Sequence, residues 1–273
     1  MNSFMSWVGG KKNLRDEVLA RFPPYYERYI EVFGGAGWVL FHKPPGMDFE
    51  VYNDFNSNLA NLYRCVRDKP AKLKYKLRYV LDSREDFDLT SSLHKRGILP
   101  RLYDVDRAAK FYQLIRYSYA SGLDSFGSQP HSIWSDFPMI DLAARRLQKV
   151  VVENKDFEKL IKQYDRPVSF FYCDPPYFAT ENYYKDVGFT AKDHIRLRDT
   201  LLDIKGKFLV SYNDCPEIRE IWDKPNIHIE EISRLNNLAQ RYDAGCQYGE
   251  LLISNYDTSE RAKAIKQLSL FDN

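Results

Sequence analysis

Residues 28–41 read RYIEVFGGAGWVLF, which combines a short apolar strand, a turn with three glycines and the start of an apolar helix. Residues 49–66, FEVYNDFNSNLANLYRCV, repeat this order, with a strand that ends near Asp54, an asparagine-rich turn, and apolar residues at helical spacing. Two successive strand–helix units favour an α/β fold with a mostly parallel sheet. In such a sheet the ligand-binding crevice lies outside the carboxyl ends of the strands.

The same alternation returns in the second half of the chain. Helical patterns separate most of its expected strands, and Thr190 with Asp193 forms a capping-box pattern at the start of one helix. A polar connection, too short for an obvious crossover helix, precedes the last strand, so we expect that strand to return antiparallel beside its predecessor. The expected strands are KVVVEN (149–154), VSFFYCD (168–174), KFLVSY (207–212), NIHIEEI (226–232) and GELLISNY (249–256).

The segment between these two halves has a different pattern. From Arg64 to about Trp134 the chain reads as basic and helical, and it contains no convincing strand. We therefore expect residues 67–140 to form a mainly helical inserted subdomain. Residues 1–66 and 141–273 would then form the α/β domain.

Composition and charge exclude few functions. The chain has 273 residues, a hydrophobic content of 44% and a net charge of +2, so any nucleic-acid surface must come from local clusters of lysine and arginine. Its four cysteines stand singly, which argues against a disulfide framework or a zinc ribbon, and we expect no metal site. No apolar run approaches the roughly 20 residues of a membrane span. We expect a soluble, cytoplasmic protein without membrane contact.

The glycine turn and the acid after the next strand are candidate ligand-binding features. Gly34, Gly35 and Gly37 would let the backbone turn tightly and approach a ligand, although a purely structural turn would use the same residues. An acidic residue at the position of Asp54 commonly accepts hydrogen bonds from ribose hydroxyls in nucleotide-binding folds. The alternative is a helix cap, which Asp54 or Asn56 could provide. Because the two features occur together, each supports a nucleotide-type ligand.

The N-terminal stretch SWVGGKKN, residues 6–13, holds a third candidate group ahead of the first strand. Trp7, Gly10 and Lys11 supply a flat aromatic ring, a flexible turn and a cation, which would suit an adenosyl ligand with a carboxylate end. The alternative is a mobile N-terminal arm with one buried tryptophan.

The stretch FFYCDPPYF, residues 170–178, ends an apolar strand with a carboxylate and two prolines. Asp174 should project into the crevice, and the prolines fix the backbone and leave the Pro175 carbonyl free to accept a hydrogen bond. A planar molecule with an exocyclic amino group fits this arrangement, with two N–H donors on these acceptors and its ring stacked on Tyr177. The alternative is a proline turn capped by an aspartate.

Taken together, four motifs in this order resemble the DNA adenine N6-methyltransferases of the Dam class, which use S-adenosylmethionine. FYQLIRYSYASG (111–122) is similar to the start of that family's DNA-reading segment, and KFLVSYND (207–214) to the strand after its catalytic loop. The motifs are FMSWVGGKKNL (4–14) for the cofactor, YIEVFGGAG (29–37) for the glycine turn, VYNDFNSNL (51–59) for the acid and YCDPPY (172–177) for catalysis.

The resemblance covers nearly the whole chain and implies a fold and a set of site residues. The implied fold is a Rossmann-like class I methyltransferase fold, with a mostly parallel seven-stranded sheet, an antiparallel last strand and an inserted helical DNA-recognition subdomain. Asp156 with Phe157 would hold the adenine of S-adenosylmethionine. The other implied cofactor contacts are Trp7, Gly10, Lys11, the turn of Phe33, Gly34, Gly35 and Gly37 beneath the methionine part, Asp54 and Asp174.

The implied reaction is methyl transfer to the amino nitrogen of adenine in double-stranded DNA. That nitrogen is a poor nucleophile because its lone pair is delocalised into the ring. Hydrogen bonds to the Asp174 carboxylate and the Pro175 carbonyl would push electron density back onto it as it attacks the sulfonium methyl group in line. A stacked base cannot reach such a pocket, so it must flip out of the duplex. The catalytic residues would be Asp174, Pro175, Pro176 and Tyr177, with Tyr177 as the aromatic face beneath the base.

The inserted subdomain is expected to read the DNA. The basic run Lys69, Lys72, Lys74, Lys76 and Arg78 is either a phosphate-binding surface or a solvated helix face. Members specific for GATC carry an asparagine and an arginine shortly after the matching segment, whereas this chain has Asp124 there. The resemblance therefore does not predict the recognition sequence. The candidate DNA contacts are Arg116, Tyr117, Tyr119 and Ser121.

The C-terminal tail, residues 264–273, contains the pentapeptide QLSLF. It matches the peptide by which bacterial replication proteins bind the sliding clamp, and Gln267, Leu268, Leu270 and Phe271 would enter a preformed groove. The alternatives are a tail that docks on its own fold, or chance.

Three other functions deserve comparison with adenine methylation. An N4-cytosine methyltransferase also acts on an exocyclic amino group and can use a similar motif. A C5-cytosine enzyme would need a nucleophilic thiol after a proline, and the chain contains no Pro-Cys dipeptide. A nucleic-acid-binding homologue without turnover is disfavoured by the intact motif from Asp174 to Tyr177. Motif order and the position of the insertion favour adenine.

Overall fold

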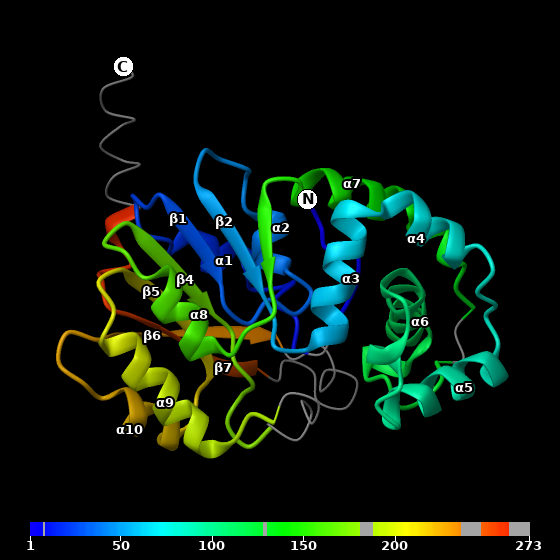
Figure 1. The fold of residues 1–273 in the computed structure, drawn as a ribbon. Coiled ribbons are helices and arrows are strands. Elements are labelled where there is room, and N and C mark those ends of the chain that lie inside the picture. The colour runs from blue at the N-terminus through cyan, green and yellow to red at the C-terminus, as the bar shows by residue number, and fades with distance from the viewer. Residues whose placement is uncertain (8, 128–129, 181–187, 236–246, 262–273) are drawn as a thin grey trace. The chain divides into compact units, whose positions relative to one another are not determined.

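A computed structural model describes residues 1–7, 9–127, 130–180, 188–235 and 247–261 (Figure 1). Its sheet has seven strands in the order β3-β2-β1-β4-β5-β7-β6. β4 pairs in parallel with β1 and β5, and β7 lies antiparallel between β5 and β6, so the predicted fold class and the antiparallel last strand are confirmed. The strands are β1 (Arg28–Glu31), β2 (Phe49–Asn53), β3 (Val150–Glu153), β4 (Ser169–Cys173), β5 (Lys207–Asn213), β6 (His228–Leu235) and β7 (Gln247–Ser254).

The helices follow the expected strand–helix alternation. Between α3 and α7 the described residues form no extended strand, only one isolated bridge between Ser118 and Phe126, as the sequence predicts. The α-helices are α1 (Arg15–Ala20), α2 (Trp38–His42), α3 (Ser57–Asp68), α4 (Pro70–Leu77), α5 (Arg84–Lys95), α6 (Asp104–Tyr117), α7 (Phe137–Leu147), α8 (Phe157–Tyr164), α9 (Ala191–Leu202) and α10 (Pro216–Trp222). Short 3-10 turns span Leu99–Arg101, Tyr119–Ser121 and Ile133–Asp136.

The chain divides into two compact units. The first comprises residues 1–10, 34–45 and 51–155, and the second comprises residues 11–33, 46–50 and 156–273. The segment predicted as an insertion, residues 67–140, lies wholly within the first unit, together with α3, α7 and β3. The division into an α/β domain and an inserted subdomain at residues 67 and 140 therefore stays a prediction.

The core of the first unit forms around α3, which packs against α4, α6 and α7. Its apolar residues at helical spacing, Leu59, Leu62, Tyr63 and Val66, are all fully buried. The helix begins after Asn56, whose side chain accepts hydrogen bonds from two backbone N–H groups of the first turn. Helices α4, α6 and α7 thus pack on α3, the helix that follows strand β2.

The core of the second unit forms around β4, whose five residues are all buried. The ring of Phe170 on this strand lies 4.6 Å from that of Phe22, centroid to centroid, in an edge-to-face contact. A strand buried on both faces, as β4 is, is typical of the centre of an α/β sheet.

At the start of α9, Thr190 and Asp193 form the predicted capping box.

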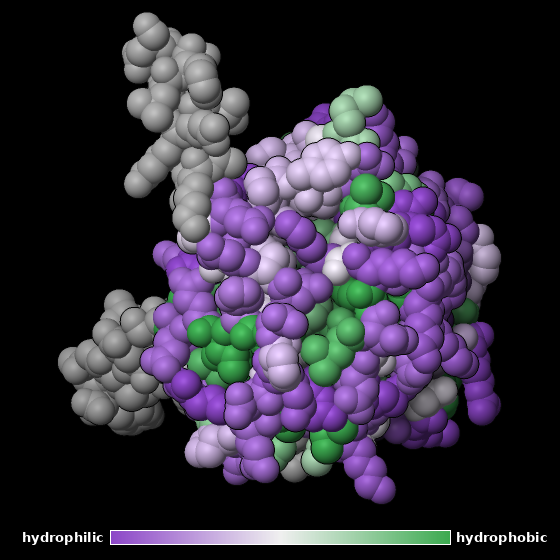
Figure 2. Space-filling model, turned by 90° about the vertical axis from the view of Figure 1, so that its left-hand side faces the viewer, coloured by the Kyte–Doolittle hydropathy of each residue, from purple (hydrophilic) through white to green (hydrophobic). Residues whose placement is uncertain are grey.

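The surface is largely polar on the face shown in Figure 2, where hydrophobic side chains form small separate groups. Among the described residues, no helix combines the length and apolar character that a membrane crossing requires.

Candidate active site

The glycine turn of the first unit is tight, and side chains of the protein pack closely against it; its predicted approach to a ligand stays a prediction. The Gly34 N–H donates to the Asn53 carbonyl at 2.8 Å, and a Cβ at Gly34 would overlap the ring of Tyr52. Gly35 and Gly37 have φ of 50° and 63°, in the left-handed region that side chains disfavour. Three glycines are therefore required here by sterics, because side chains of the protein occupy the positions that their Cβ atoms would take.

Asp54 holds this turn in place. Its carboxylate accepts hydrogen bonds from the backbone N–H groups of Gly35 at 2.9 Å and Asn56 at 2.8 Å. The helix cap is Asn56, so of the two candidates for that role the structure selects the asparagine. Burial raises the pKa of Asp54 to about 6, although the two N–H donors act in the opposite direction. A carboxylate with this pKa gains from any further hydrogen-bond donor that a ligand supplies.

Trp7 and Gly10 lie against the same turn. A Cβ at Gly35 would lie 3.1 Å from the Trp7 ring, and the Gly10 N–H donates to the Trp7 carbonyl at 3.1 Å. The Trp7 ring also contacts Phe111, with centroids 5.8 Å apart. The first unit thus brings Trp7, Gly10, the three glycines of the turn and Asp54 together, as predicted.

The second unit contains the motif from Asp174 to Tyr177. Asp174 directly follows β4 and its side chain is 17% exposed, whereas Pro175 and Pro176 are buried. The ammonium group of Lys11, itself almost fully buried, forms an ion pair with the Asp174 carboxylate. The same ammonium lies 4.5 Å from the centroid of the Tyr177 ring, in a cation–π contact.

Lys11 therefore contacts the Asp174 carboxylate, which was predicted to accept the amino group, and the Tyr177 ring, which was predicted to stack on the base. The sequence placed it among the cofactor contacts and gave no sign of its ion pair with Asp174. An ammonium and an exocyclic amino group present the same kind of N–H donor to a carboxylate. A base that approached Asp174 across the Tyr177 ring would take the place of the lysine ammonium.

Two residues that the sequence did not predict hold the end of this motif. The Tyr177 hydroxyl donates to the carboxylate of Glu250 at 2.5 Å, and the side chain of Asn213 accepts from the backbone N–H of Phe178 at 3.1 Å. Burial, and then the carboxylates of Asp174 and Glu250, raise the pKa of Tyr177 well above its usual value. Two features of the sequence could have pointed to these residues. Asn213 lies in KFLVSYND, the stretch similar to the family's strand after the catalytic loop, and Glu250 is the single carboxylate in the apolar strand GELLISNY.

Asp156 and Phe157 begin α8 in the second unit. The Asp156 carboxylate caps the helix through the Glu158 N–H at 3.1 Å and binds the Arg196 guanidinium at 2.9 Å. Its helix-capping role is thus visible, and its predicted contact with a cofactor adenine stays a prediction. The ring of Phe157 is buried beneath that of Phe33, with centroids 5.7 Å apart.

Phe189 completes this aromatic cluster, which the sequence did not predict. Its ring lies 5.9 Å from Phe33 and 6.0 Å from Phe157, centroid to centroid. Phe33 and Phe189 are partly exposed, whereas Phe157 is buried. The second unit therefore brings Phe33, Asp156 and Phe157 together with an open aromatic surface.

The candidate DNA contacts differ sharply in exposure. Tyr119 is 65% exposed, but Tyr117 and Ser121 are buried, at 3% and 7% exposure. Arg116 binds the Asp136 carboxylate at 2.9 Å and also contacts His131. Of the four predicted contacts, Tyr119 alone presents a large free surface, and the described structure does not support direct DNA contact by Tyr117 or Ser121.

The loop that carries Tyr119 is held in a strained conformation. Ala120, Ser121 and Leu123 all have φ between 51° and 64°, which is uncommon for residues other than glycine. The Tyr119 N–H donates to the Ser125 carbonyl at 2.7 Å and closes the loop. A fixed loop of this kind holds the exposed tyrosine ring in one place.

Most of the basic run near α4 is neutralised. Lys69 binds Asp104, Lys74 binds Asp141 at 2.6 Å, and Lys76 binds Asp106 at 2.8 Å. Lys72 and Arg78 are exposed and form no ion pair with another described residue. The structure thus favours the solvated helix face over a continuous phosphate-binding surface.

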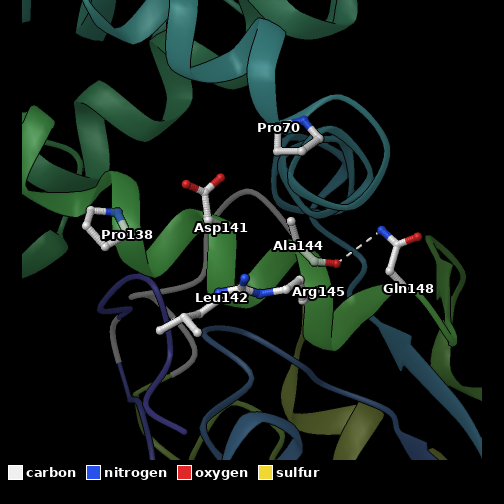
Figure 3. Close-up of a pocket in the computed structure, with 7 residues that line it drawn as sticks. All are labelled: Pro70, Pro138, Asp141, Leu142, Ala144, Arg145 and Gln148. Atoms are coloured by element: carbon white, nitrogen blue, oxygen red, sulfur yellow. Dashed lines mark hydrogen bonds between the residues drawn. The ribbon is translucent and has the colours of Figure 1, made fainter.

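A surface pocket of about 690 Å³ lies between α7 and the start of α4 (Figure 3). Pro70, Pro138 and Leu142 supply apolar walls, and the Asp141 side chain points toward α4. None of its lining residues belongs to the predicted site.

In the part of the chain that the structure describes, no group of three His, Cys, Asp or Glu side chains could hold a metal ion. The predicted clamp peptide, residues 267–271, lies outside the described residues.

Comparison with known proteins gives one consistent result. The model of the family described as "D12 class N6 adenine-specific DNA methyltransferase" matches residues 7–237. The Type II methyltransferase M1.LlaDCHI of Lactococcus lactis subsp. cremoris is 30% identical over 279 residues, which is 94% of this chain and 96% of that protein. The DNA adenine methylases of Vibrio cholerae serotype O1 and Escherichia coli are each 26% identical, over 85% of this chain and 88% of theirs.

Proposed function

The chain belongs to the D12 class of N6 adenine-specific DNA methyltransferases, and from this premise we propose which of its residues bind the methyl donor and perform the transfer. Its reaction is methylation of the adenine amino group in DNA, so the N4-cytosine alternative and a homologue without turnover are not supported. The observation that carries the assignment is the arrangement of Asp174, Lys11 and Tyr177, where one N–H donor already lies on the carboxylate and over the ring.

We propose S-adenosylmethionine as the methyl donor. It supplies an electrophilic methyl group on a sulfonium centre. Two sets of residues fit such a ligand: the Cβ-free turn with Asp54 and Trp7 in the first unit, and the aromatic cluster with Asp156 in the second. The Asp54 carboxylate would accept ribose hydroxyls, and Phe33 with Phe157 would contact the adenine. Gly10, Gly34, Gly35 and Gly37 support the proposal by letting the rings around the turn pack directly on its backbone, which fixes its shape.

The chemistry at the target base follows from the residues after β4. The Asp174 carboxylate, 17% exposed, would accept one N–H of the adenine amino group, and the Pro175 carbonyl the other. Accepting a hydrogen bond from each N–H returns electron density to the nitrogen, and the one proton that the methylated amino group must lose would pass to the Asp174 carboxylate or to water. The Tyr177 ring would hold the flipped base in line. Lys11 would leave this position when the base enters, and its charge keeps the buried carboxylate compensated before then.

We also propose a residue that contacts DNA, a cellular role and a location for the protein. Tyr119 is the candidate contact that the structure best supports, because its ring is exposed on a fixed loop. The name of the Lactococcus relative, a Type II methyltransferase, supports a role beside a restriction enzyme. A DNA substrate supports a place in the cytoplasm, associated with the nucleoid.

The contact with a sliding clamp rests on the sequence QLSLF alone. A peptide covering residues 264–273 should bind a bacterial clamp in fluorescence polarisation, and Phe271→Ala should abolish the signal. No affinity for the clamp, or equal affinity of the Phe271→Ala peptide, removes this proposal and leaves methylation untouched.

Methyl transfer from labelled S-adenosylmethionine tests the proposed function. Wild-type protein should label unmethylated DNA, and digestion to nucleosides should place the label in N6-methyladenine. Sequencing of methylated positions in DNA from expressing cells would read the recognition site. Label in a cytosine product, or no label with this donor, contradicts the proposal.

A further inference from the structure

Two side chains that the reaction does not use hold residues 177–178, the segment at the end of the catalytic motif. Glu250 lies on β7 and is 1% exposed, although it carries a carboxylate. It pairs across the sheet with Asn213 on β5 and with Ile232 on β6, so its backbone is fixed from both sides. Asn213 and Glu250 are thus direct neighbours on two antiparallel strands.

Each of these neighbours binds one residue of the segment. The Glu250 carboxylate accepts the Tyr177 hydroxyl at 2.5 Å, which is a short hydrogen bond. The Asn213 side chain accepts from the Phe178 N–H at 3.1 Å and donates to the Phe178 carbonyl at 3.4 Å. One bond fixes the far end of the tyrosine ring, and the other two fix the backbone next to it.

We propose that Glu250 and Asn213 are positioning residues for the target base, because they fix the position of the Tyr177 ring on which the base lies. The inference rests on the proposed role of Tyr177. A tyrosine side chain anchored only at its Cα can swing about χ1, whereas a bond to its hydroxyl, which lies on the ring axis, fixes the direction of that axis. Fixing the ring before the base arrives lowers the entropy lost on stacking.

The chemical cost of this arrangement supports a functional reading. A carboxylate buried within a sheet is unfavourable unless it is compensated, and an apolar residue would pack there at lower cost. The Tyr177 ring also carries the Lys11 ammonium on its face, 4.5 Å from the centroid. The Glu250 carboxylate, bound to that tyrosine, adds negative charge at the edge of the ring.

Base flipping and single-turnover methylation test the inference, with the target adenine of a mapped site replaced by 2-aminopurine in the fluorescence assay. Glu250→Leu should lower kcat/KM for DNA and the 2-aminopurine signal by about tenfold or more, with unchanged affinity for S-adenosylmethionine. Glu250→Gln keeps an acceptor and should recover activity to within about threefold of wild type. Tyr177→Phe, which leaves Glu250 in place, should match Glu250→Leu, and the double variant should be no worse.

A matched pair of asparagines controls for structural effects. The Asn255 side chain forms two hydrogen bonds to the backbone, as that of Asn213 does. It accepts from the Phe208 N–H at 2.9 Å and donates to the Gly206 carbonyl at 3.0 Å. Asn255→Ala should lower thermal stability and leave base flipping unchanged, whereas Asn213→Ala should reduce flipping. Full flipping and methylation in both Tyr177→Phe and Asn213→Ala overturn the inference, even if Glu250→Leu fails to fold.

The same experiment separates this inference from the proposed function. Asp174→Ala should lose methyl transfer whether or not the hydrogen bonds from Glu250 and Asn213 position the Tyr177 ring. If Asp174→Ala is inactive while the Tyr177→Phe and Asn213→Ala variants behave as wild type, the site stands and the positioning role is wrong. If Asp174→Ala is fully active, the proposed site itself fails.

Discussion

Single residues of the catalytic motif were readable from the sequence because their chemistry is local. A carboxylate and two prolines after an apolar strand predict a rigid acceptor, and the structure places Asp174 directly after β4. The partners of these residues were not readable, since Lys11 precedes Asp174 by 163 residues and Glu250 follows Tyr177 by 73. Such contacts depend on the order of strands in the sheet, which no local pattern encodes.

Asp54 should make cofactor binding depend on pH. Because its pKa is raised to about 6 by burial, protonation between pH 7 and 5 removes a hydrogen-bond acceptor for the ribose. We expect affinity for S-adenosylmethionine to fall about tenfold from pH 7 to 5 in isothermal titration calorimetry. Asp54→Asn should bind weakly throughout and lose the inflection near pH 6.

The stability of the unliganded protein should change in the opposite sense. A carboxyl group whose folded pKa lies above its unfolded pKa favours the protonated folded state, so this contribution raises stability as pH falls from about 6 toward 4. Urea unfolding of wild type and Asp54→Asn over this range isolates the contribution. Equal pH slopes in the two proteins would show that Asp54 titrates normally.

Elements followed the sequence closely where periodicity was strong. The strands around the predicted catalytic motif and the capping box of α9 appear at their expected positions. The contact between α8 and α9 was not predicted. Arg196 on α9 binds Asp156 and Glu158 at the start of α8 as well as Asp193 on its own helix, and local periodicity does not show contacts between separate helices. The conformation of the loop after α6 was not predicted, since Ala120, Ser121 and Leu123 adopt a left-handed backbone that such residues disfavour.

Arg196→Met should weaken the junction between α8 and α9. The guanidinium also lies 4.0 Å from the centroid of Phe157, so its loss removes ion pairs and a ring contact together. Since the arginine side chain is 39% exposed, solvent screens the pairs, and we expect the free energy of unfolding to fall by about 1–2 kcal/mol in urea. Lys192→Met, an exposed change on the same helix, should stay within about 0.5 kcal/mol. Equal effects of both substitutions would contradict a stabilising role for Arg196.

For the whole molecule, the strand–helix order predicted the sheet, and the motif order predicted the family. The two compact units were not predicted, because each combines segments that are distant in the sequence. Burial of Tyr117 and Ser121 also required the fold, since the sequence FYQLIRYSYASG does not show which residues of the loop face the core. Which of the candidate DNA contacts are exposed is therefore a property that only the fold shows.

Tyr119→Ala should weaken DNA binding without affecting stability. Its ring is 65% exposed on a closed loop, and loss of an aromatic contact to a base costs about 1–3 kcal/mol, or roughly tenfold or more in affinity. Tyr103→Ala removes a ring of similar exposure, 62%, from the same unit and serves as the control. Fluorescence polarisation with a labelled duplex should separate the two variants, and equal affinities would exclude Tyr119 as a DNA contact.

Single-turnover methylation by Asp174→Ala tests the central claim most directly, with Asp165→Ala as its control. Asp165 precedes β4 and binds the backbone N–H groups of Lys205 and Gly206, so its loss costs stability at the opposite end of the strand. We predict that Asp174→Ala retains its fold and S-adenosylmethionine affinity within about tenfold but loses methyl transfer by about 10³-fold or more, while Asp165→Ala methylates as wild type does. Wild-type methylation by Asp174→Ala would contradict the account.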